Sequence, residues 1–147
     1  LDFAMIADYA TGVGARTYHH TVPISMIYAL HAGLGVLLEE GLYQVQARHQ
    51  ACGDRLQVGL VKRGFHLFAQ EGHRLPELTS VIVPADRLPD GIDEVAVRRR
   101  LLVEYGIEIG GGLGPVAGEV WRIGCMGHTA REHNVTMLLG ALDEILG

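Results

Sequence analysis

The sequence has little lysine, little cysteine and no long apolar run, and each shortage excludes a class of protein. Lys62 is the single lysine among the 12 lysine and arginine side chains, and the net charge is −5. Binding of nucleic acid needs a basic surface, so we exclude nucleic acid as a partner. Two cysteines, Cys52 and Cys125, cannot form a disulfide framework, which fits the reducing cytoplasm. No apolar run approaches the roughly 18 residues of a membrane span, and no signal-peptide pattern opens the chain, so no membrane partner is expected.

The remaining composition is that of one globular domain. The chain has 147 residues, of which 48% are hydrophobic and 20% are charged, as is ordinary for a soluble domain with a sizeable core. No internal repeat or low-complexity segment occurs. The first residue is Leu1 rather than methionine, so we expect either a start inside a longer reading frame or a processed terminus.

A glycine-rich turn leads into a run that predicts a short strand around Arg122. Alternation along a strand puts Trp121 and Ile123 on one face and Val120 and Arg122 on the other, so we expect the guanidinium to face outward. Gly112 and Gly114, in the turn before the strand, allow a ligand or another chain to approach the backbone closely. A planar fork of donors beside such an opening suits a carboxylate held by two parallel hydrogen bonds. The alternative is an exposed arginine that pairs with a surface acid.

A second polar group lies near the start of the chain. The hydroxyls of Tyr18 and Thr21 precede Pro23, which predicts the start of a helix. Both hydroxyls can donate toward an anion near the helix N-terminus. The alternative is that Thr21 is only the N-cap of that helix.

Histidines in the same region raise a metal hypothesis, which we reject. His19 and His20 are adjacent, and His31 is the third candidate ligand. Neighbouring side chains on an extended segment point to opposite sides, so they do not easily share one ion. We expect ordinary hydrogen-bonded histidines and no metal.

Two separated motifs resemble one enzyme family. GIEIGGGLGP at residues 106–115, followed by WRIGCMGHTAREHNV at residues 121–135, is similar to the C-terminal segment of class V pyridoxal-phosphate aminotransferases. The similarity is closest to the alanine–glyoxylate and serine–glyoxylate (serine–pyruvate) group, and YHHTVP at residues 18–23 agrees with it in order. The resemblance implies that Arg122 binds the α-carboxylate of the substrate. It also implies that Tyr18 and Thr21 bind the phosphate of the cofactor held mainly by the partner subunit of a homodimer.

The resemblance implies a reaction that this chain is not equipped to perform alone. The family uses pyridoxal 5'-phosphate to move an amino group from an amino acid such as alanine or serine to a 2-oxo acid such as glyoxylate or pyruvate. Its Schiff-base lysine and the aspartate that pairs with the cofactor ring lie upstream of the matched segment, and no residue here matches either. Lys62, beside Arg63 at a predicted helix end, is interpreted as a solvated cation. We expect an inactive C-terminal domain; the alternative is a non-catalytic binding or dimerisation module, or a truncated remnant.

Helical and strand patterns alternate along the chain. Helices are predicted for residues 24–40, 43–63, 90–105 and 129–147, and strands for residues 65–69, 79–84, 107–109 and 119–124. This order predicts an α+β domain with a small, mostly antiparallel sheet of about four strands covered by helices. By resemblance, it is the C-terminal small domain of a fold-type I enzyme. On the same resemblance, we expect residues 1–22 to be an arm or linker from a missing large domain and residues 23–147 to be the small domain.

Local patterns predict which side chains cap helices and which are buried. Asp90 is expected to cap the third helix, and Thr129 with Glu132 has the spacing of a capping box. His49 lies on a buried stripe with Cys52, where we expect it to be satisfied by hydrogen bonds. The three arginines at residues 98–100 are expected on a solvated face. The predicted apolar faces are Ile27, Leu30, Leu34 and Leu37 in the first helix, Val45, His49, Cys52, Leu56 and Leu60 in the second, Ile92, Val95 and Leu102 in the third, and Val135, Leu138, Leu142 and Ile145 in the last.

Overall fold

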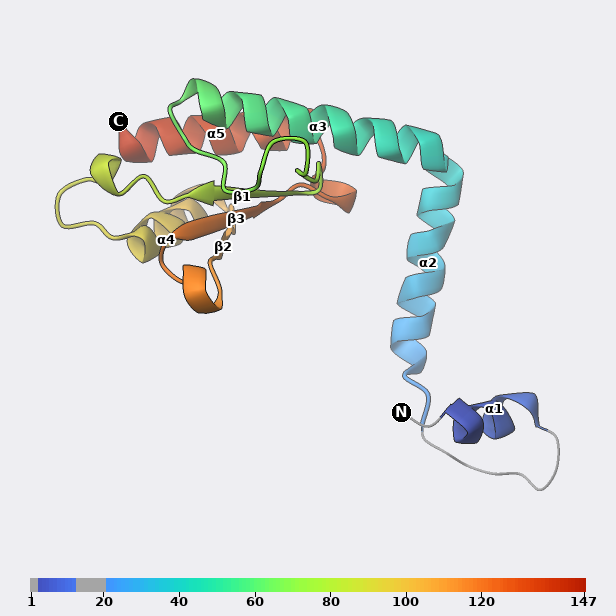
Figure 1. Ribbon diagram of the computed structural model, residues 1–147. Coiled ribbons are helices and arrows are strands. Elements are labelled where there is room, and N and C mark those ends of the chain that lie inside the picture. Colours follow the sequence, from blue (N-terminus) through green and yellow to red (C-terminus); the bar gives the residue numbers. More distant parts are fainter. Residues whose placement is uncertain (1–2, 13–20) are drawn as a thin grey trace. The chain divides into compact units, whose positions relative to one another are not determined.

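A computed structural model describes residues 3–12 and 21–147 of the chain (Figure 1). The chain divides into two compact units, Leu1–Glu40 and Gly41–Gly147, each with its own internal contacts. This division falls after residue 40, whereas the boundary inferred from the sequence falls after residue 22 and stays a prediction. None of the helices in the described ranges is both long enough and apolar enough to cross a membrane.

The first unit contains two helices, α1 (Phe3–Thr11) and α2 (Ile24–Glu40). α2 begins directly after Pro23, whose carbonyl accepts a hydrogen bond from the backbone of Ile27 at 3.1 Å. Proline has no N–H to lose at this position, so it suits a helix start. The bounds of α2 confirm the sequence prediction.

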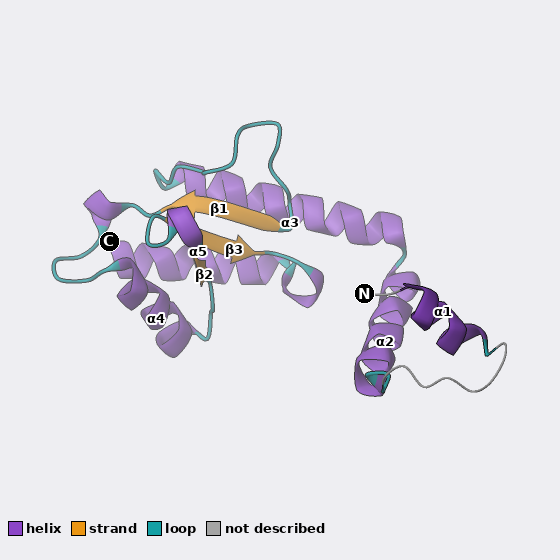
Figure 2. Ribbon diagram, turned by 60° about the horizontal axis from the view of Figure 1, so that its bottom comes forward, coloured by secondary structure: helices purple, strands orange, loops and turns teal. Residues whose placement is uncertain are grey.

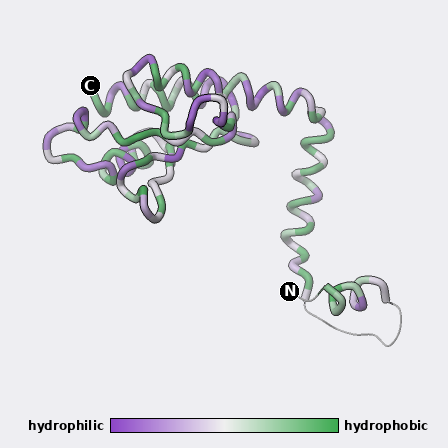
Figure 3. The backbone as a smooth tube through the Cα atoms, in the orientation of Figure 1, coloured by the Kyte–Doolittle hydropathy of each residue, from purple (hydrophilic) through white to green (hydrophobic). Residues whose placement is uncertain are grey.

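The predicted burial of the apolar face of α2 is wrong for this structure. No residue of α2 is buried, and Figure 3 shows hydrophobic residues along the helix. Helical spacing predicts which side chains share a face, but it does not tell whether another surface covers that face. The large hydrophobic residues of α2 that are exposed are Ile24, Met26, Ile27, Tyr28, Leu30, Leu34, Val36 and Leu38.

The second unit is built from helices packed on a small sheet. Its helices are α3 (Leu42–Lys62), α4 (Glu94–Tyr105) and α5 (Glu132–Leu146), and its strands are β1 (Leu78–Ile82), β2 (Gly110–Gly111) and β3 (Val120–Gly124). The strand order is β1-β3-β2, and both pairings are antiparallel. The predicted α+β class and the antiparallel pairing are therefore confirmed.

The sheet has three strands in the part of the chain that the structure describes, where about four were predicted. Residues 65–69 contribute one bridge, between Leu67 and Val81, rather than a strand. Residues 107–109 lie just before β2, which pairs with β3 only through its two glycines. Side-chain propensity predicts extended backbone, whereas a strand also requires a partner in the right register.

One apolar core lies between the helices and the sheet. α3 and α5 lie side by side over the sheet (Figures 1 and 2). Trp121 of β3 has no exposed surface, and the centroid of its ring lies 6.4 Å from that of Phe65. The predicted stripe of α5 is confirmed, because Val135, Leu138, Leu142 and Ile145 are all buried. The stripe of α3 is confirmed for His49, Cys52, Leu56 and Leu60, whereas Val45 is only half-buried.

α4 turns a different face to the core than predicted. Val97 and Leu101 are buried, whereas Val95 and Leu102 are 51% and 48% exposed. Apolar residues lie on more than one side of this helix, so spacing alone does not select the buried side. The buried side is the one that also carries Glu94, which accepts a hydrogen bond from the indole of Trp121.

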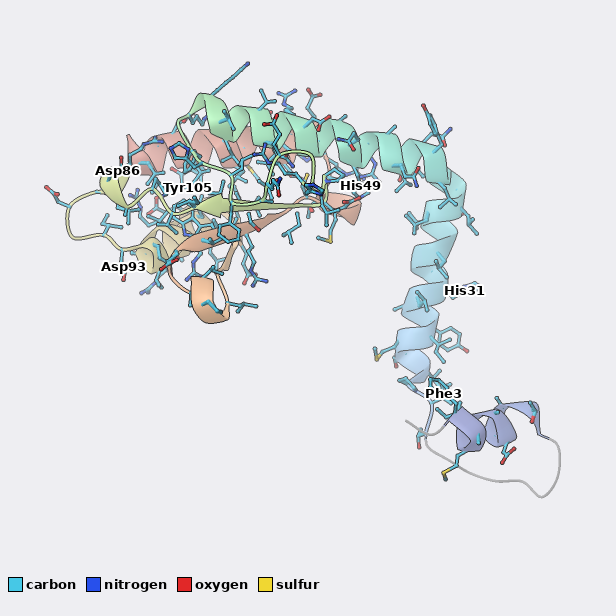
Figure 4. The ribbon with its side chains drawn as sticks, viewed as in Figure 1. Phe3, His31, His49, Asp86, Asp93 and Tyr105 are labelled. Atoms are coloured by element: carbon cyan, nitrogen blue, oxygen red, sulfur yellow. The ribbon has the colours of Figure 1, made fainter. Side chains whose placement is uncertain are left out.

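Two predicted helix caps are wrong. α4 begins at Glu94, and its cap is Asp93, whose carboxylate accepts from the backbone N–H of Ala96 at 2.8 Å (Figure 4). Asp90 lies three residues too early. The hydroxyl of Thr129 donates to the carbonyl of Met126 at 2.8 Å and so closes the short turn before α5 instead of capping the helix. Several residues with capping chemistry lie near both starts, and only the backbone path selects among them.

His49 is satisfied by two hydrogen bonds, as predicted (Figure 4). Its Nδ1 lies 2.6 Å from the carbonyl of Val45, and its Nε2 accepts from the backbone N–H of Gly127 at 2.9 Å. The ring therefore joins α3 to the turn that precedes α5. Cys52, on the same stripe, is a free thiol buried in the core, and Cys125 is buried and free as well.

We predict that Asp93→Ala lowers the free energy of unfolding of the second unit by about 1 kcal/mol, because the first turn of α4 loses its side-chain cap. Asp90→Ala is the matched control, since Asp90 is exposed and lies outside the helix; its effect should stay within about 0.5 kcal/mol. Denaturant unfolding followed by the fluorescence of Trp121, the single tryptophan, measures both. Equal losses in the two variants would show that the cap is assigned wrongly.

Candidate functional site

Arg122 lies in the middle of β3, the central strand of the sheet. Trp121 and Ile123 are buried in the core, so alternation places Arg122 on the opposite face, as predicted. Its partners across the sheet are Ser80 on β1 and Gly110 on β2. Both neighbours are small, which leaves room for a guanidinium. We call this surface the Arg122 face; by register and alternation it comprises Leu78, Ser80, Ile82, Gly110, Val120 and Arg122. Val120, predicted on the outward face with Arg122, is buried.

The guanidinium of Arg122 is oriented by a backbone carbonyl. Its Nε donates to the oxygen of Gly111 at 2.8 Å, and the residue is half-buried. A Cβ at Gly110 would lie 3.3 Å from Nη2 of Arg122, so glycine leaves the space that the side chain occupies. No carboxylate in residues 3–12 or 21–147 forms an ion pair with Arg122. The alternative of an ordinary surface ion pair therefore finds no support.

The turn between β2 and β3 depends on glycine at two positions. A Cβ at Gly112 would overlap the carbonyl oxygen of Val116. Gly114 has a φ of 55°, in the left-handed region that favours glycine. Gly112 allows the chain to approach itself and Gly114 allows a left-handed backbone, which accounts for the presence of both without a ligand. Their predicted contact with a substrate stays a prediction.

On the helix side of the same strands, Glu94 of α4 accepts three hydrogen bonds. Arg98 donates to its two oxygens at 2.8 and 3.1 Å, and the indole of Trp121 donates at 3.1 Å. The hydrogen bonds from Arg98 lower the pKa of Glu94 most; desolvation opposes them, and the bond from Trp121 adds to the lowering. The bonds to Glu94 in turn raise the pKa of Arg98. Glu94 is therefore a charged carboxylate that joins α4 to the central strand.

Arg98 is not on a solvated face, which corrects the prediction for the three arginines. Its side chain is 26% exposed, and its guanidinium lies over Gly111, where a Cβ would meet Cζ at 3.3 Å. Arg100 pairs with Glu104 at 2.9 Å in a more exposed position on the same helix. Successive helical residues point in different directions, and only one of these arginines reaches the sheet.

The other predicted ligands lie in the first unit. Tyr18, His19 and His20 fall outside the described residues, and Thr21 is exposed. Pro23 rather than Thr21 is the residue directly before α2. His31 is exposed on α2 (Figure 4). Where the structure describes the chain, no three His, Cys, Asp or Glu side chains form a group that could hold a metal ion.

Lys62 is the exposed last residue of α3. Its neighbour Arg63 forms a two-bond ion pair with Asp143 of α5, with both bonds at 2.7 Å. The pair lowers the pKa of Asp143, chiefly through these hydrogen bonds. Lys62 itself is the solvated cation that the sequence predicts.

Two hollows of the second unit lie apart from Arg122. One, of about 180 Å³, lies between α3, the segment before β2 and α5, and its lining includes Leu56, Ile107 and Leu138. The other, of about 470 Å³, lies beside Arg48, Arg55 and Arg131. Neither lining includes Arg122, so its environment is the sheet face and not one of these hollows.

Sequence reasoning missed three groups near Arg122: the carbonyl of Gly111, the carboxylate of Glu94 and the guanidinium of Arg98. The spacing of Glu94 and Arg98 is that of a helical ion pair, so this signal was available. The bond between Trp121 and Glu94 joins residues 27 positions apart, and no local pattern predicts it.

No protein-family model matches the chain, but individual proteins are similar along nearly all of it. The (S)-ureidoglycine–glyoxylate transaminase of Bacillus subtilis is 38% identical over 145 residues, which are 99% of this chain and 33% of that enzyme. The alanine–glyoxylate aminotransferase of Drosophila melanogaster is 36% identical over 147 residues, which are 99% of this chain and 36% of that enzyme. The crystal structure of an alanine–glyoxylate aminotransferase from Nostoc sp. superposes with a TM-score of 0.82 at 42% identity, covering 99% of this chain and 37% of that protein.

The chain spans about a third of the length of the curated relatives it matches. The matched region is their C-terminal part. The resemblance to class V aminotransferases of the alanine–glyoxylate group is therefore confirmed, and so is the fold of the C-terminal region of a fold-type I enzyme.

We predict that the indole N–H resonance of Trp121 shifts in acid with a midpoint below the usual pKa of glutamic acid, because Arg98 favours the charged form of Glu94. A lowered folded pKa means that the stabilisation is complete above the unfolded pKa and is lost as the pH falls through the folded pKa. The loss of stability in Glu94→Gln, relative to the parent chain, should therefore shrink as the pH falls. In the same variant the acid shift of the Trp121 indole N–H resonance should disappear. Glu104→Gln, in the exposed pair with Arg100, should leave the transition in place. A midpoint at or above the usual value in the parent chain would contradict this assignment.

Proposed function

We propose that this chain is the C-terminal small domain of a pyridoxal-phosphate-dependent aminotransferase in which Arg122 binds the α-carboxylate of the substrate. The observation that carries the proposal is the state of Arg122: it is half-buried, oriented through Nε and free of an ion pair with the acids of the described chain. Partly desolvating a cation is costly unless an anion compensates it. Similarity to glyoxylate aminotransferases along nearly the whole chain supports an anionic substrate as that partner.

Arg122 has the chemistry to orient a carboxylate as well as to attract it. With Nε bonded to Gly111, the two Nη groups remain to donate in parallel to two oxygens. A planar fork sets the plane of the carboxylate, which a point charge such as an ammonium does not. Holding the substrate by this end restricts the directions in which its amino group can point.

The proposed cofactor is pyridoxal 5'-phosphate, on which relatives of this class depend. When bound, it supplies an electron sink for the carbon that carries the amino group. From this chain, the hydroxyls of Tyr18 and Thr21 would bind its phosphate across the interface of a homodimer, and Thr21 is exposed as this role requires. Lys62 does not fit the role of the lysine that binds the cofactor, because it lies exposed at the end of a surface helix. We place that lysine in a part of the enzyme outside this sequence.

The substrates proposed are an amino acid such as alanine or serine and a 2-oxo acid such as glyoxylate or pyruvate. The names of three relatives share glyoxylate and differ in the donor, which is ureidoglycine, alanine or aspartate. Every one of these donors carries an α-carboxylate. Arg122 would therefore bind the group that the substrates have in common, and the choice of donor would depend on other residues.

We predict that Arg122→Gln in the full-length enzyme raises KM for the amino donor by roughly 30-fold or more, the factor that about 2 kcal/mol of lost ion pairing gives. Arg122→Lys keeps the charge but not the fork, so it should recover only part of the loss. Steady-state kinetics over a range of donor and acceptor concentrations measures the effect.

The acceptor is a carboxylate as well, so its KM should rise in the same variants. Arg100→Gln removes an arginine from the exposed pair with Glu104 and serves as the control. Unchanged KM values for both substrates in Arg122→Gln would refute the proposed role.

We also predict that the 147-residue chain alone does not catalyse amino transfer, because its single lysine is not placed to bind the cofactor. The purified chain, mixed with pyridoxal 5'-phosphate, alanine and glyoxylate, should form neither pyruvate nor glycine. Product formation that Arg122→Gln abolishes would contradict this prediction.

The second candidate is a non-catalytic binding or dimerisation module, and the exposed apolar residues of α2 favour it. Among the described residues, no atom other than those of the adjoining α2 backbone and chain neighbours lies within 4 Å of a Cβ placed at Gly33 or Gly35, so this helix can accept a close neighbour. Sedimentation of the same chain separates the two candidates. A stable dimer without turnover supports an independent module, whereas a monomer supports an incomplete enzyme.

A further inference from the structure

We propose that Arg98 is a positioning residue for Arg122: paired with Glu94, it holds Gly111 in place, and the carbonyl of Gly111 orients the Arg122 guanidinium. The inference rests on the proposed function, since it gives Arg98 a part in placing the group that binds the substrate carboxylate. The geometry that supports it lies wholly within the second unit.

β2 by itself fixes the position of the Gly111 carbonyl only weakly. It has two residues, both glycine, and it lies at the edge of the sheet with a single partner strand. Glycine loses more conformational freedom on ordering than any other residue, and a short edge strand has few bonds to resist opening. The carbonyl that accepts from Arg122 therefore needs support from outside the strand.

Arg98 supplies this support from the helix side. A Cβ at Gly111 would lie 3.3 Å from both Cζ and Nη2 of Arg98, so the planar guanidinium covers the α-carbon of Gly111. The strand is then held by β3 along its edge and by Arg98 on its core side. A side chain at position 111 would displace Arg98, which explains why glycine is present at a position without a positive φ.

Glu94 locks Arg98 in this place and also neutralises it. The carboxylate accepts two bonds from Arg98 and a third from Trp121, which is the cross-strand partner of Gly111. The helix, the central strand and the edge strand thus meet at one ion pair. Of the two guanidiniums beside β2, only Arg122 is left to attract an external anion.

α4 provides an internal control for this arrangement. Arg98–Glu94 and Arg100–Glu104 are both ion pairs between residues four apart, with Nε–O distances of 2.8 and 2.9 Å. The first pair touches Gly111 and Trp121, whereas the second is more exposed, with side chains 36% and 44% exposed. Neutralising either arginine removes the same charge from the same helix. Only a positioning role predicts that substitution of Arg98 affects the Arg122 guanidinium more than substitution of Arg100 does.

The direct test is solvent exchange of the Arg122 Nε–H in the ¹⁵N-labelled 147-residue chain, with its resonance assigned by its loss in Arg122→Lys. In Arg98→Gln we expect this exchange to become about tenfold faster, because the accepting carbonyl is no longer held. In Arg100→Gln it should change less than twofold. Equal rates in Arg98→Gln and Arg100→Gln, with the backbone amide spectrum still folded, would overturn the proposal.

Arg98→Lys covers the case in which Arg98→Gln does not fold. Lysine keeps the charge opposite Glu94 but cannot cover Gly111 with a planar group, so exchange at Arg122 should again accelerate relative to Arg100→Lys. Identical exchange in these two lysine variants would also overturn the proposal.

Kinetics of the full-length enzyme separate this inference from the proposed function. If both hold, Arg98→Gln raises KM for the amino donor about tenfold with a smaller change in kcat, and Arg100→Gln does not. If Arg122→Gln leaves KM unchanged, the proposed function fails, although exchange can still show that Arg98 orients Arg122. If Arg122→Gln raises KM but Arg98→Gln matches Arg100→Gln in both KM and exchange, the positioning role alone fails.

Discussion

The hydrogen bond from Arg122 to the carbonyl of Gly111 decides what the exposed face of the sheet presents. Without this bond the Arg122 side chain would adopt many conformations, and its charge would attract anions without orienting them. With Nε fixed, the remaining donors form a fork of defined direction. The small neighbours Ser80 and Gly110 matter for the same reason, because a larger side chain in either place would crowd the fork.

The central strand couples the hydrophobic core to this face. Trp121 is packed without exposed surface on the core side, and the next residue, Arg122, lies on the other side. The indole also bonds to Glu94, so α4 is tied to the strand that carries Arg122. Because Trp121 and Arg122 are adjacent, a shift of the core packing would also move Arg122. The tightly packed core therefore gives this small domain a rigid support for a ligand-binding group.

Much of this architecture could be predicted from local patterns. The buried stripes of α3 and α5 follow from spacing, because each helix has one continuous apolar side. The face of Arg122 follows from strand alternation. The starts of α4 and α5 could not be predicted, since Asp90 and Asp93 have equal capping chemistry and the backbone path selects between them. β2 could not be predicted either, because glycines carry no strand signal and pair here only through the register of β3.

The sequence by itself determined the α+β class, the main helices, the outward direction of Arg122 and the similarity to aminotransferases. Each of these depends on residues that are close in the chain or on motifs that can be compared directly. The tertiary structure alone decided that Gly111 orients Arg122, that Glu94 bonds to Trp121, and that Arg98 rather than Arg100 reaches the sheet. These contacts join distant segments, and their formation depends on helix rotation and strand register, which short-range periodicity does not specify.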